Sequence, residues 1–320
     1  IGTSLKGVSN MDFLLETSNA ASLAESKKSG ITELNQLQGE TEYMADVLRA
    51  MGKFLPVPIV KHVLKANLQP QVGVRKMDAT LLFLSIADLP TLLENHDSHA
   101  MIFEMFEEFS RILTTHGAVI GSYSVGKMMC YWGCPDPIDD PVERACGAVD
   151  DIVIAMDDMN RRRSVQMKIQ IGIHCGQVHC GNIGSSTTLS FTLIGHTVDI
   201  ASRLESVNRK LGTTVLVSDE VRKKAGARFN WRCLGLLTIH GITTPIRMHE
   251  YMGMTGSITL TGMKQTVVSQ YADIDKHLLA SGKDVGIAVL EEYITENSED
   301  ASVFKYLEFI MSKKYQTAIH

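Results

Sequence analysis

The sequence predicts an α+β fold in which strands and helices follow a ferredoxin-like order. The apolar run at residues 79–86 is typical of a buried strand, and the long apolar stripes after it recur at helical spacing. Strand, helix, two strands, helix and strand in this order form an α+β sandwich. The predicted elements are strand Ala79–Ile86, loop and helix Asp88–His116, strands Gly117–Gly121 and Met128–Trp132, helix Pro141–Arg161 and strand Met167–Ile173.

Length and charge limit the function classes. A chain of 320 residues can hold one globular domain of roughly 150 to 200 residues with flanking elements. A net charge of −5 without a long basic block argues against nucleic acid as the main partner. No apolar run approaches the ~20 residues of a membrane span. Because the chain begins with Ile1, we expect a cytoplasmic piece of a longer protein whose upstream sensor or membrane region is missing.

The cysteines predict thiols rather than a disulfide framework. Six are scattered through apolar segments, which is typical of buried free thiols in a reducing compartment. His174, Cys175, His179 and Cys180 have the ligand types of a zinc site, but adjacent residues of a strand point to opposite faces. We therefore do not expect zinc there.

The regions on either side of the main domain have a different character. Residues 1–30 predict an irregular lead-in, and 31–77 a linker with an amphipathic helix from Ile31. That helix either packs on its own domain or pairs two copies as a parallel coiled coil that transmits an upstream signal. Residues 78–253 hold the main domain, and 254–320 predict a helical tail that resembles one tetratricopeptide-like helix pair.

The main domain is organised around Ile171–Glu205. Alternating apolar residues and glycines predict two strands joined by a turn at Gly176–Gln177, a second turn at Gly184–Ser186 and a third strand at Phe191–Ile194. A helix then follows, with Thr197 as its expected N-cap. Its predicted apolar face consists of Val198, Ala201, Leu204 and Val207.

This stretch reads IGIHCGQVHCGNIGSSTTLSFTLIGHTVDIASRLE and resembles the signature of class III nucleotidyl cyclases, GIHxGxxxxGNIGS followed by YTxIGxxVNxAxRLE. The resemblance covers about residues 78–251 and implies conversion of ATP or GTP to a cyclic nucleotide and pyrophosphate. It implies two metal ions, Mg²⁺ or Mn²⁺, that activate the ribose 3′-oxygen and neutralise developing charge. It also implies a site at a dimer interface, with two aspartates from one subunit and an Asn and an Arg from the other.

The metal-binding motifs of that family are altered here. In FxDIxGF, Ser85 stands where the first aspartate belongs. In KxIGDGxMAFWG, Trp132–Gly133 fixes the register, which puts Gly126 at the second aspartate and Ser122 at the base-reading lysine. Neither replacement supplies an anionic oxygen, and Mg²⁺ is usually held through carboxylates. We expect no metal site in this chain alone, least of all if Lys127 points inward.

The other half of the family's site is partly kept. The resemblance puts Arg203 at the catalytic arginine, Asp199 at the asparagine and Thr192 at the second base-reading residue, while His196 replaces a common aspartate. Two simpler explanations stay open. Arg203 could pair with Glu205 or with solvent, and a threonine on a strand can reflect β-propensity alone.

Three functions remain open at this point. The first is a pseudo-cyclase that dimerises at the cyclase interface, with or without bound ATP or GTP. The second is an active half of a heterodimer whose partner supplies the metal-binding aspartates. The third is a self-sufficient cyclase with unusual ligands, such as Asp88, or a purely structural interaction module.

Overall fold

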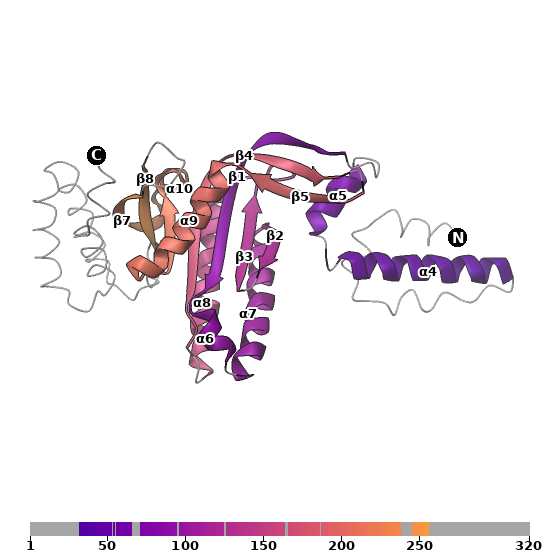
Figure 1. Ribbon diagram of the computed structural model, residues 1–320, viewed down its shortest axis with the longest axis horizontal. Coiled ribbons are helices and arrows are strands. Elements are labelled where there is room, and N and C mark those ends of the chain that lie inside the picture. The colour runs from indigo at the N-terminus through magenta and orange to yellow at the C-terminus, as the bar shows by residue number, and fades with distance from the viewer. Residues whose placement is uncertain are drawn as a thin grey trace, which may run out of the picture. The chain divides into compact units, whose positions relative to one another are not determined.

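The computed structural model describes residues 32–52, 54, 56–65, 71–94, 96–124, 126–163, 166–185, 187–237 and 245–255. The chain divides into two compact units, Ile1–Gln71 and Val72–His320. The first contains helices α4 (Thr32–Gly52) and α5 (Val57–Lys65) (Figure 1). None of the helices in these ranges is both long enough and apolar enough to cross a membrane. The expected lead-in and the tail from residue 256 onward lie outside the described residues.

The second unit is built on one sheet. Among the described residues this sheet has eight strands in the order β2-β3-β1-β4-β6-β8-β7, with β5 paired to β4. Strands β4 and β6 run parallel, and the remaining neighbours are antiparallel. The strands are β1 (Gly73–Ile86), β2 (Val119–Ser124), β3 (Lys127–Trp132), β4 (Ile169–Gly184), β5 (Leu189–Ile194), β6 (Val215–Ser218), β7 (Phe229–Leu237) and β8 (Ile246–Met254).

Helices cover both faces of the sheet. The main core lies between the sheet and helices α7 (His96–Thr115), α8 (Pro141–Arg161) and α10 (Asp219–Ala225). Helix α9 (His196–Leu211) packs on the opposite face (Figure 1). Because side chains alternate along a strand, Leu82 and Leu84 of β1 enter the main core while Ser85 faces α9. The α+β prediction is confirmed by this architecture.

Several predicted elements are found with small changes of boundary. Helix α8 has the predicted limits, and its predicted apolar stripe is buried. The range Asp88–His116 contains two helices instead of one, α6 (Leu89–Leu93) and α7. Asp88, with φ 52°, precedes α6, and Pro90 lies in its first turn. Strand β1 begins six residues before the predicted start, at Gly73.

The predicted turn at Gly176–Gln177 is wrong. Strand β4 continues through these residues, which pair with Ala79 and Asp78 of β1 in an unbroken ladder. Gly176 has a different purpose: a Cβ there would lie 3.0 Å from the hydroxyl of Thr197. The missing side chain therefore lets α9 approach the sheet, and only the second predicted turn, after Gly184, is present.

The predicted start and face of α9 are also corrected. The N-cap is Gly195, and the Thr197 hydroxyl donates to the carbonyl of Gln177 at 2.7 Å instead of capping the helix. The buried face includes Ala201 and Leu204 as predicted, but it is completed by Glu205 and Asn208. Val198 and Val207 are only half-buried. Polar residues with specific partners thus replace part of the expected apolar stripe.

Helix α9 lies unusually close to β4. A Cβ on Gly172 would lie 2.2 Å from the backbone nitrogen of Glu205 and 2.4 Å from the carbonyl oxygen of Ala201. The Asn208 amide donates to the carbonyl of Ile171 at 2.9 Å and fixes the same contact. This approach brings the α9 side chains directly against the end of β1.

We predict that Gly172→Ala destabilises the domain by about 3 kcal/mol or more, because the new methyl group would meet helix backbone that cannot rotate away. Urea unfolding of the full chain checks this. The matched control is Gly73→Ala, where nothing lies within 4 Å of the new Cβ. Equal stability of the two variants would contradict the close packing of α9 on β4.

Candidate functional site

The two positions that the resemblance assigns to metal-binding aspartates are neighbours in the structure. Ser85 is buried one residue before the end of β1 and pairs with Lys127 of β3. The Ile86 N–H donates to the carbonyl of Gly126 at 2.9 Å, and Gly126 has φ 70° in the turn before β3. The register inferred from Trp132–Gly133 therefore brings Ser85 and Gly126 together.

A buried carboxylate connects these positions to α9. Glu205 has 3% of its side-chain surface exposed. Its carboxylate accepts a hydrogen bond from the Ser85 hydroxyl. The Ser206 hydroxyl lies 3.2 Å from the same carboxylate and 3.0 Å from the carbonyl of Ser202, so its one proton is shared between them. The Lys127 ammonium lies 3.1 Å from the same carboxylate. A buried carboxylate needs such a cation and such donors, because ionised groups are costly to remove from water unpaired.

These residues do not fit a divalent metal ion. Ser85 offers a neutral hydroxyl that is already donated to Glu205, and Gly126 offers no side chain. The ammonium of Lys127 would repel a second cation placed beside Glu205. Within the described ranges, no group of three or more His, Cys, Asp or Glu side chains could hold a metal.

A second ion pair joins α9 to the loop after β1. Arg209 and Asp88 lie 3.4 Å apart, and both side chains are largely exposed. Asp88 therefore lies outside the network of Glu205, and the idea that it replaces the missing aspartate has no contact to support it. The end of β1 is thus held to α9 by one buried pair, Glu205 with Lys127, and one exposed pair.

The retained arginine faces away from this network. Arg203 is two residues before Glu205, which places it roughly 160° around the helix, and it is exposed. Asp199 is exposed as well and precedes Arg203 by one helical turn. Arg203 does not pair with Glu205, whose partners are Ser85, Lys127 and Ser206. The simpler explanation of a local Arg203–Glu205 pair is therefore wrong.

The two base-reading candidates lie in different parts of the sheet. Ser122 is exposed on β2 and pairs with Met129, two strands from Ser85. Thr192 on β5 is opposite Gly181, which in turn is opposite Val74 of β1. Ser85 follows Val74 by eleven positions on β1, which is roughly 35 Å along the strand. One chain therefore does not bring Thr192 and Ser85 to the same site.

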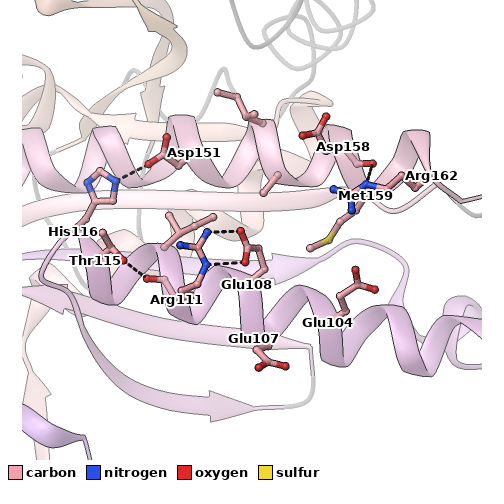
Figure 2. Close-up of a pocket in the computed structure, with 13 residues that line it drawn as sticks. Glu104, Glu107, Glu108, Arg111, Thr115, His116, Asp151, Asp158, Met159 and Arg162 are labelled. Atoms are coloured by element: carbon pink, nitrogen blue, oxygen red, sulfur yellow. Dashed lines mark hydrogen bonds and ion pairs between the residues drawn. The ribbon is translucent and has the colours of Figure 1, made fainter. Parts of the chain in front are cut away.

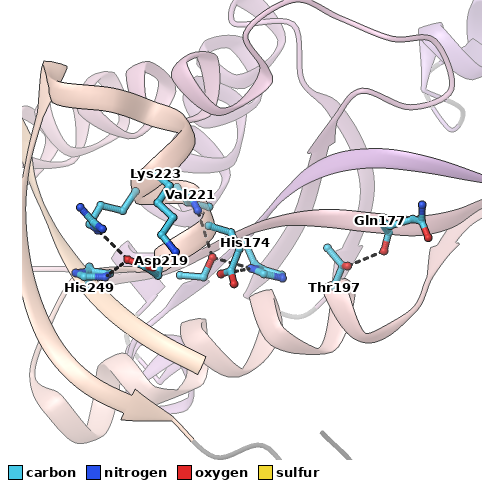
Figure 3. Close-up of polar contacts among 10 residues, drawn as sticks. His174, Gln177, Thr197, Asp219, Val221, Lys223 and His249 are labelled. Atoms are coloured by element: carbon cyan, nitrogen blue, oxygen red, sulfur yellow. Dashed lines mark hydrogen bonds and ion pairs between the residues drawn. The ribbon is translucent and has the colours of Figure 1, made fainter. Parts of the chain in front are cut away.

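The signature histidine belongs to a separate polar cluster (Figure 3). Nδ1 of His174 lies 2.7 Å from the Ser218 hydroxyl, which also accepts the Val221 N–H as the N-cap of α10. Burial lowers the pKa of His174 to about 4, with Glu220 opposing and Lys224 adding to the shift. The imidazole is therefore neutral near pH 7 and supports the start of α10.

The next residues of the same cluster carry charge. Burial opposes ionisation of Asp219, but hydrogen bonds from Lys223, Arg222 and His249 outweigh it and lower the pKa of this carboxyl. His249 Nε2 lies 2.9 Å from its Oδ1 (Figure 3). All these partners lie on α10 and β8, so they stabilise that corner of the domain instead of forming part of the site at Ser85.

A surface groove of about 580 Å³ lies between α7 and α8 (Figure 2). Its polar groups are largely paired with each other: His116 with Asp151 at 2.7 Å, and Arg111 with Glu108 at 2.6 Å. Both helices lie on the face of the sheet opposite α9. The groove is therefore separate from the network around Glu205.

The residue that sequence reasoning missed is Glu205. From the sequence alone, Glu205 is only a possible partner of Arg203. The available signal was its position four residues after Ala201 and one after Leu204, both on the predicted buried face. A carboxylate at a position that helical spacing buries needs a cation, and Lys127 was the unexplained cation of the altered motif.

Comparison with known proteins gives one consistent result. A family model described as "Adenylate and Guanylate cyclase catalytic domain" matches residues 73–253. "Adenylate cyclase 1" of Rhizobium meliloti is 25% identical over 240 residues, which is 73% of this chain and 36% of that protein. The chain spans about a third of the length of the first curated relatives it matches.

Solved structures agree at the level of the fold. A bacterial light-regulated adenylyl cyclase matches with a TM-score of 0.62 and 18% identity, covering 77% of this chain and 72% of that one. The adenylyl cyclase CyaB from P. aeruginosa matches with a TM-score of 0.51 and 21% identity, covering 56% of this chain and 96% of that one.

We predict that buried His174 makes stability depend on pH. The unfolded imidazole binds a proton below its ordinary pKa of 6.5, whereas the folded one does so near 4. Protonation therefore favours unfolding, and wild-type stability falls relative to His174→Asn as pH drops from about 6.5 to 4, by roughly 1 kcal/mol per pH unit. Urea unfolding at several pH values checks this, and a difference that stays constant with pH would refute it.

Proposed function

Because this chain belongs to the adenylate and guanylate cyclase catalytic domain family, we propose that it is a pseudo-cyclase. In this proposal it is a signalling domain that dimerises through the cyclase interface and does not convert ATP or GTP to a cyclic nucleotide. Its role is to pair with a second cyclase domain and to pass on the state of other parts of a longer protein.

One observation carries the proposal. The two positions that the resemblance assigns to metal-binding aspartates hold Ser85 and Gly126, and the Lys127 ammonium beside them is bound to Glu205. Cyclisation needs the ribose 3′-oxygen deprotonated and the developing charge on the phosphates neutralised, which the family's two metal ions would do. Ser85 is committed to Glu205, and Lys127 neutralises that carboxylate. No described side chain at this position is left to act as a base toward the 3′-hydroxyl.

An exposed apolar face supports dimerisation. Strand register places Val74, Ile183 and Ile194 on one face of the arm formed by β5 and the adjoining ends of β1 and β4 (Figure 1). These three side chains are 45%, 38% and 46% exposed. Exposed apolar side chains gathered on one face are typical of protein interfaces. Thr192 lies on the same face, next to where a second domain would sit.

The positions of the remaining site residues also support a two-chain site. Arg203 and Asp199 point away from the Ser85 network of their own chain, and Thr192 is roughly 35 Å along the sheet from it. Such residues can complete a site only on another domain. In this proposal Arg203 and Asp199 face the nucleotide position of the partner. Thr192 and Ser122 correspond to the residues that contact the nucleotide base.

This arrangement leaves one alternative. The exposed Arg203 has no hydrogen bond or ion pair with any residue the structure describes, so it is available to a partner domain that does carry both aspartates. In a heterodimer the chain would then be the half without metals. Asp199 counts against this role, because it places a negative charge where the family has a neutral amide.

We predict no cyclic nucleotide production by the purified chain with ATP or GTP in excess Mn²⁺, at least about a thousandfold below a domain with both aspartates. Mass spectrometry of the products checks this. Turnover that Arg203→Ala abolishes would refute the pseudo-cyclase. Turnover that appears only on mixing with a metal-bearing cyclase domain, and is lost with Arg203→Ala, would establish the heterodimer instead.

We predict that the chain dimerises and that Ile194→Lys raises the dissociation constant at least tenfold, because it places a charge on the apolar face of the arm. Sedimentation velocity over a concentration series checks this. Phe103→Lys is the matched control, since Phe103 is 73% exposed on α7, away from the arm. Dissociation by the control but not by Ile194→Lys would place the interface elsewhere.

A further inference from the structure

The pairing of Lys127 with Glu205 does not explain why the Lys127 side chain is half exposed. Its side chain is 51% exposed although it pairs with a carboxylate that is 3% exposed. Among the described residues Glu205 is its only polar partner. An ammonium carries three protons, so up to two of them face solvent at the point where β1 ends.

Resting on the proposed function, we propose that the Lys127 ammonium is the resident cation of this site. It takes the place of a divalent metal and contacts the polyphosphate of a bound nucleoside triphosphate directly, so that nucleotide binding by this chain needs no metal. The site would thus bind ATP or GTP as a ligand instead of a substrate.

The charges around Lys127 are consistent with the binding of an anion. Replacement of both aspartates by Ser85 and Gly126 removes the two carboxylates that would repel phosphate in the absence of metal. The nearest remaining acid, Glu205, is buried and already accepts hydrogen bonds from Ser85 and Lys127. The exposed acid of the neighbouring loop, Asp88, is paired with Arg209 at 3.4 Å.

The ammonium is also fixed in place. Lys127 follows the turn at Gly126, pairs across the strands with Ser85, and its side chain is held by a carboxylate on α9. An ammonium held by a buried carboxylate on a paired strand loses little freedom when an anion binds, which is the advantage of a preorganised site. A divalent ion beside it would meet repulsion and no carboxylate except Glu205, which is already paired.

The test measures binding of fluorescent ATP and GTP analogues to the full chain, in EDTA and in Mg²⁺, with tripolyphosphate as competitor. We expect equal affinity in both buffers, competition by tripolyphosphate, and at least a tenfold loss with Lys127→Gln. Lys127→Arg should keep most of the affinity because it keeps the charge. Lys210→Gln, which removes an exposed lysine from the same helix as Glu205, should change affinity less than twofold.

Because Lys127→Gln leaves a buried carboxylate unpaired and can impair folding, a second variant removes both charges. Lys127→Gln with Glu205→Gln should fold with the wild-type circular dichroism spectrum and still bind at least tenfold more weakly. Binding that requires Mg²⁺, no binding in either buffer, or equal losses with Lys127→Gln and Lys210→Gln would each overturn the inference.

These outcomes are separate from the failure of the proposed function. Cyclic nucleotide production would refute the pseudo-cyclase regardless of how the nucleotide binds. Absence of both turnover and binding would leave the dimerising domain intact and overturn only the role of Lys127.

Discussion

The burial of one carboxylate, that of Glu205, governs this end of the domain. It becomes possible because Gly172 lets α9 rest on the backbone of β4, and this contact carries the carboxylate into the space beside β1. Once there, the group needs donors and a cation, since an unpaired buried charge costs several kcal/mol. Ser85 and Lys127 supply them from two adjacent strands. Ser85 and Lys127 are therefore parts of one network that compensates the buried charge of Glu205.

The sequence predicts the order of elements well because hydrophobic periodicity records which face is buried. Helix α8 is the clearest case, with its limits and buried stripe as expected. The predicted turn at Gly176 is wrong, because this glycine instead permits close packing with Thr197. A turn and a close packing contact both favour a residue without a Cβ. A single sequence therefore does not distinguish the two roles of a glycine.

The proximity of Ser85 and Gly126 could be predicted from the sequence, whereas the contacts of Lys127 could not. Aligned motifs identified Ser85 and Gly126, and the register of β1 with β3 places them together. The partner of Lys127 could not be found in the same way, because Glu205 is 78 residues away along the chain. Pairing over such a separation depends on how α9 docks, and the docking depends on Gly172. The roles of Arg203, Asp199, Thr192 and Ser122 remain proposals, since they involve a second chain.

The two tight contacts of β4 also bear on how the sheet reaches its correct alignment. A side chain at Gly172 would collide with α9, and one at Gly181 would lie 2.1 Å from the carbonyl oxygen of Gly73. These glycines are nine residues apart on the longest strand of the sheet. If β4 slipped by one residue, every side chain would exchange faces. Ile171 or Ile173 would then enter the first narrow place, and Cys180 or Asn182 the second. The two close contacts therefore disfavour a misaligned sheet. They select the one strand register in which both positions are occupied by a residue without a Cβ.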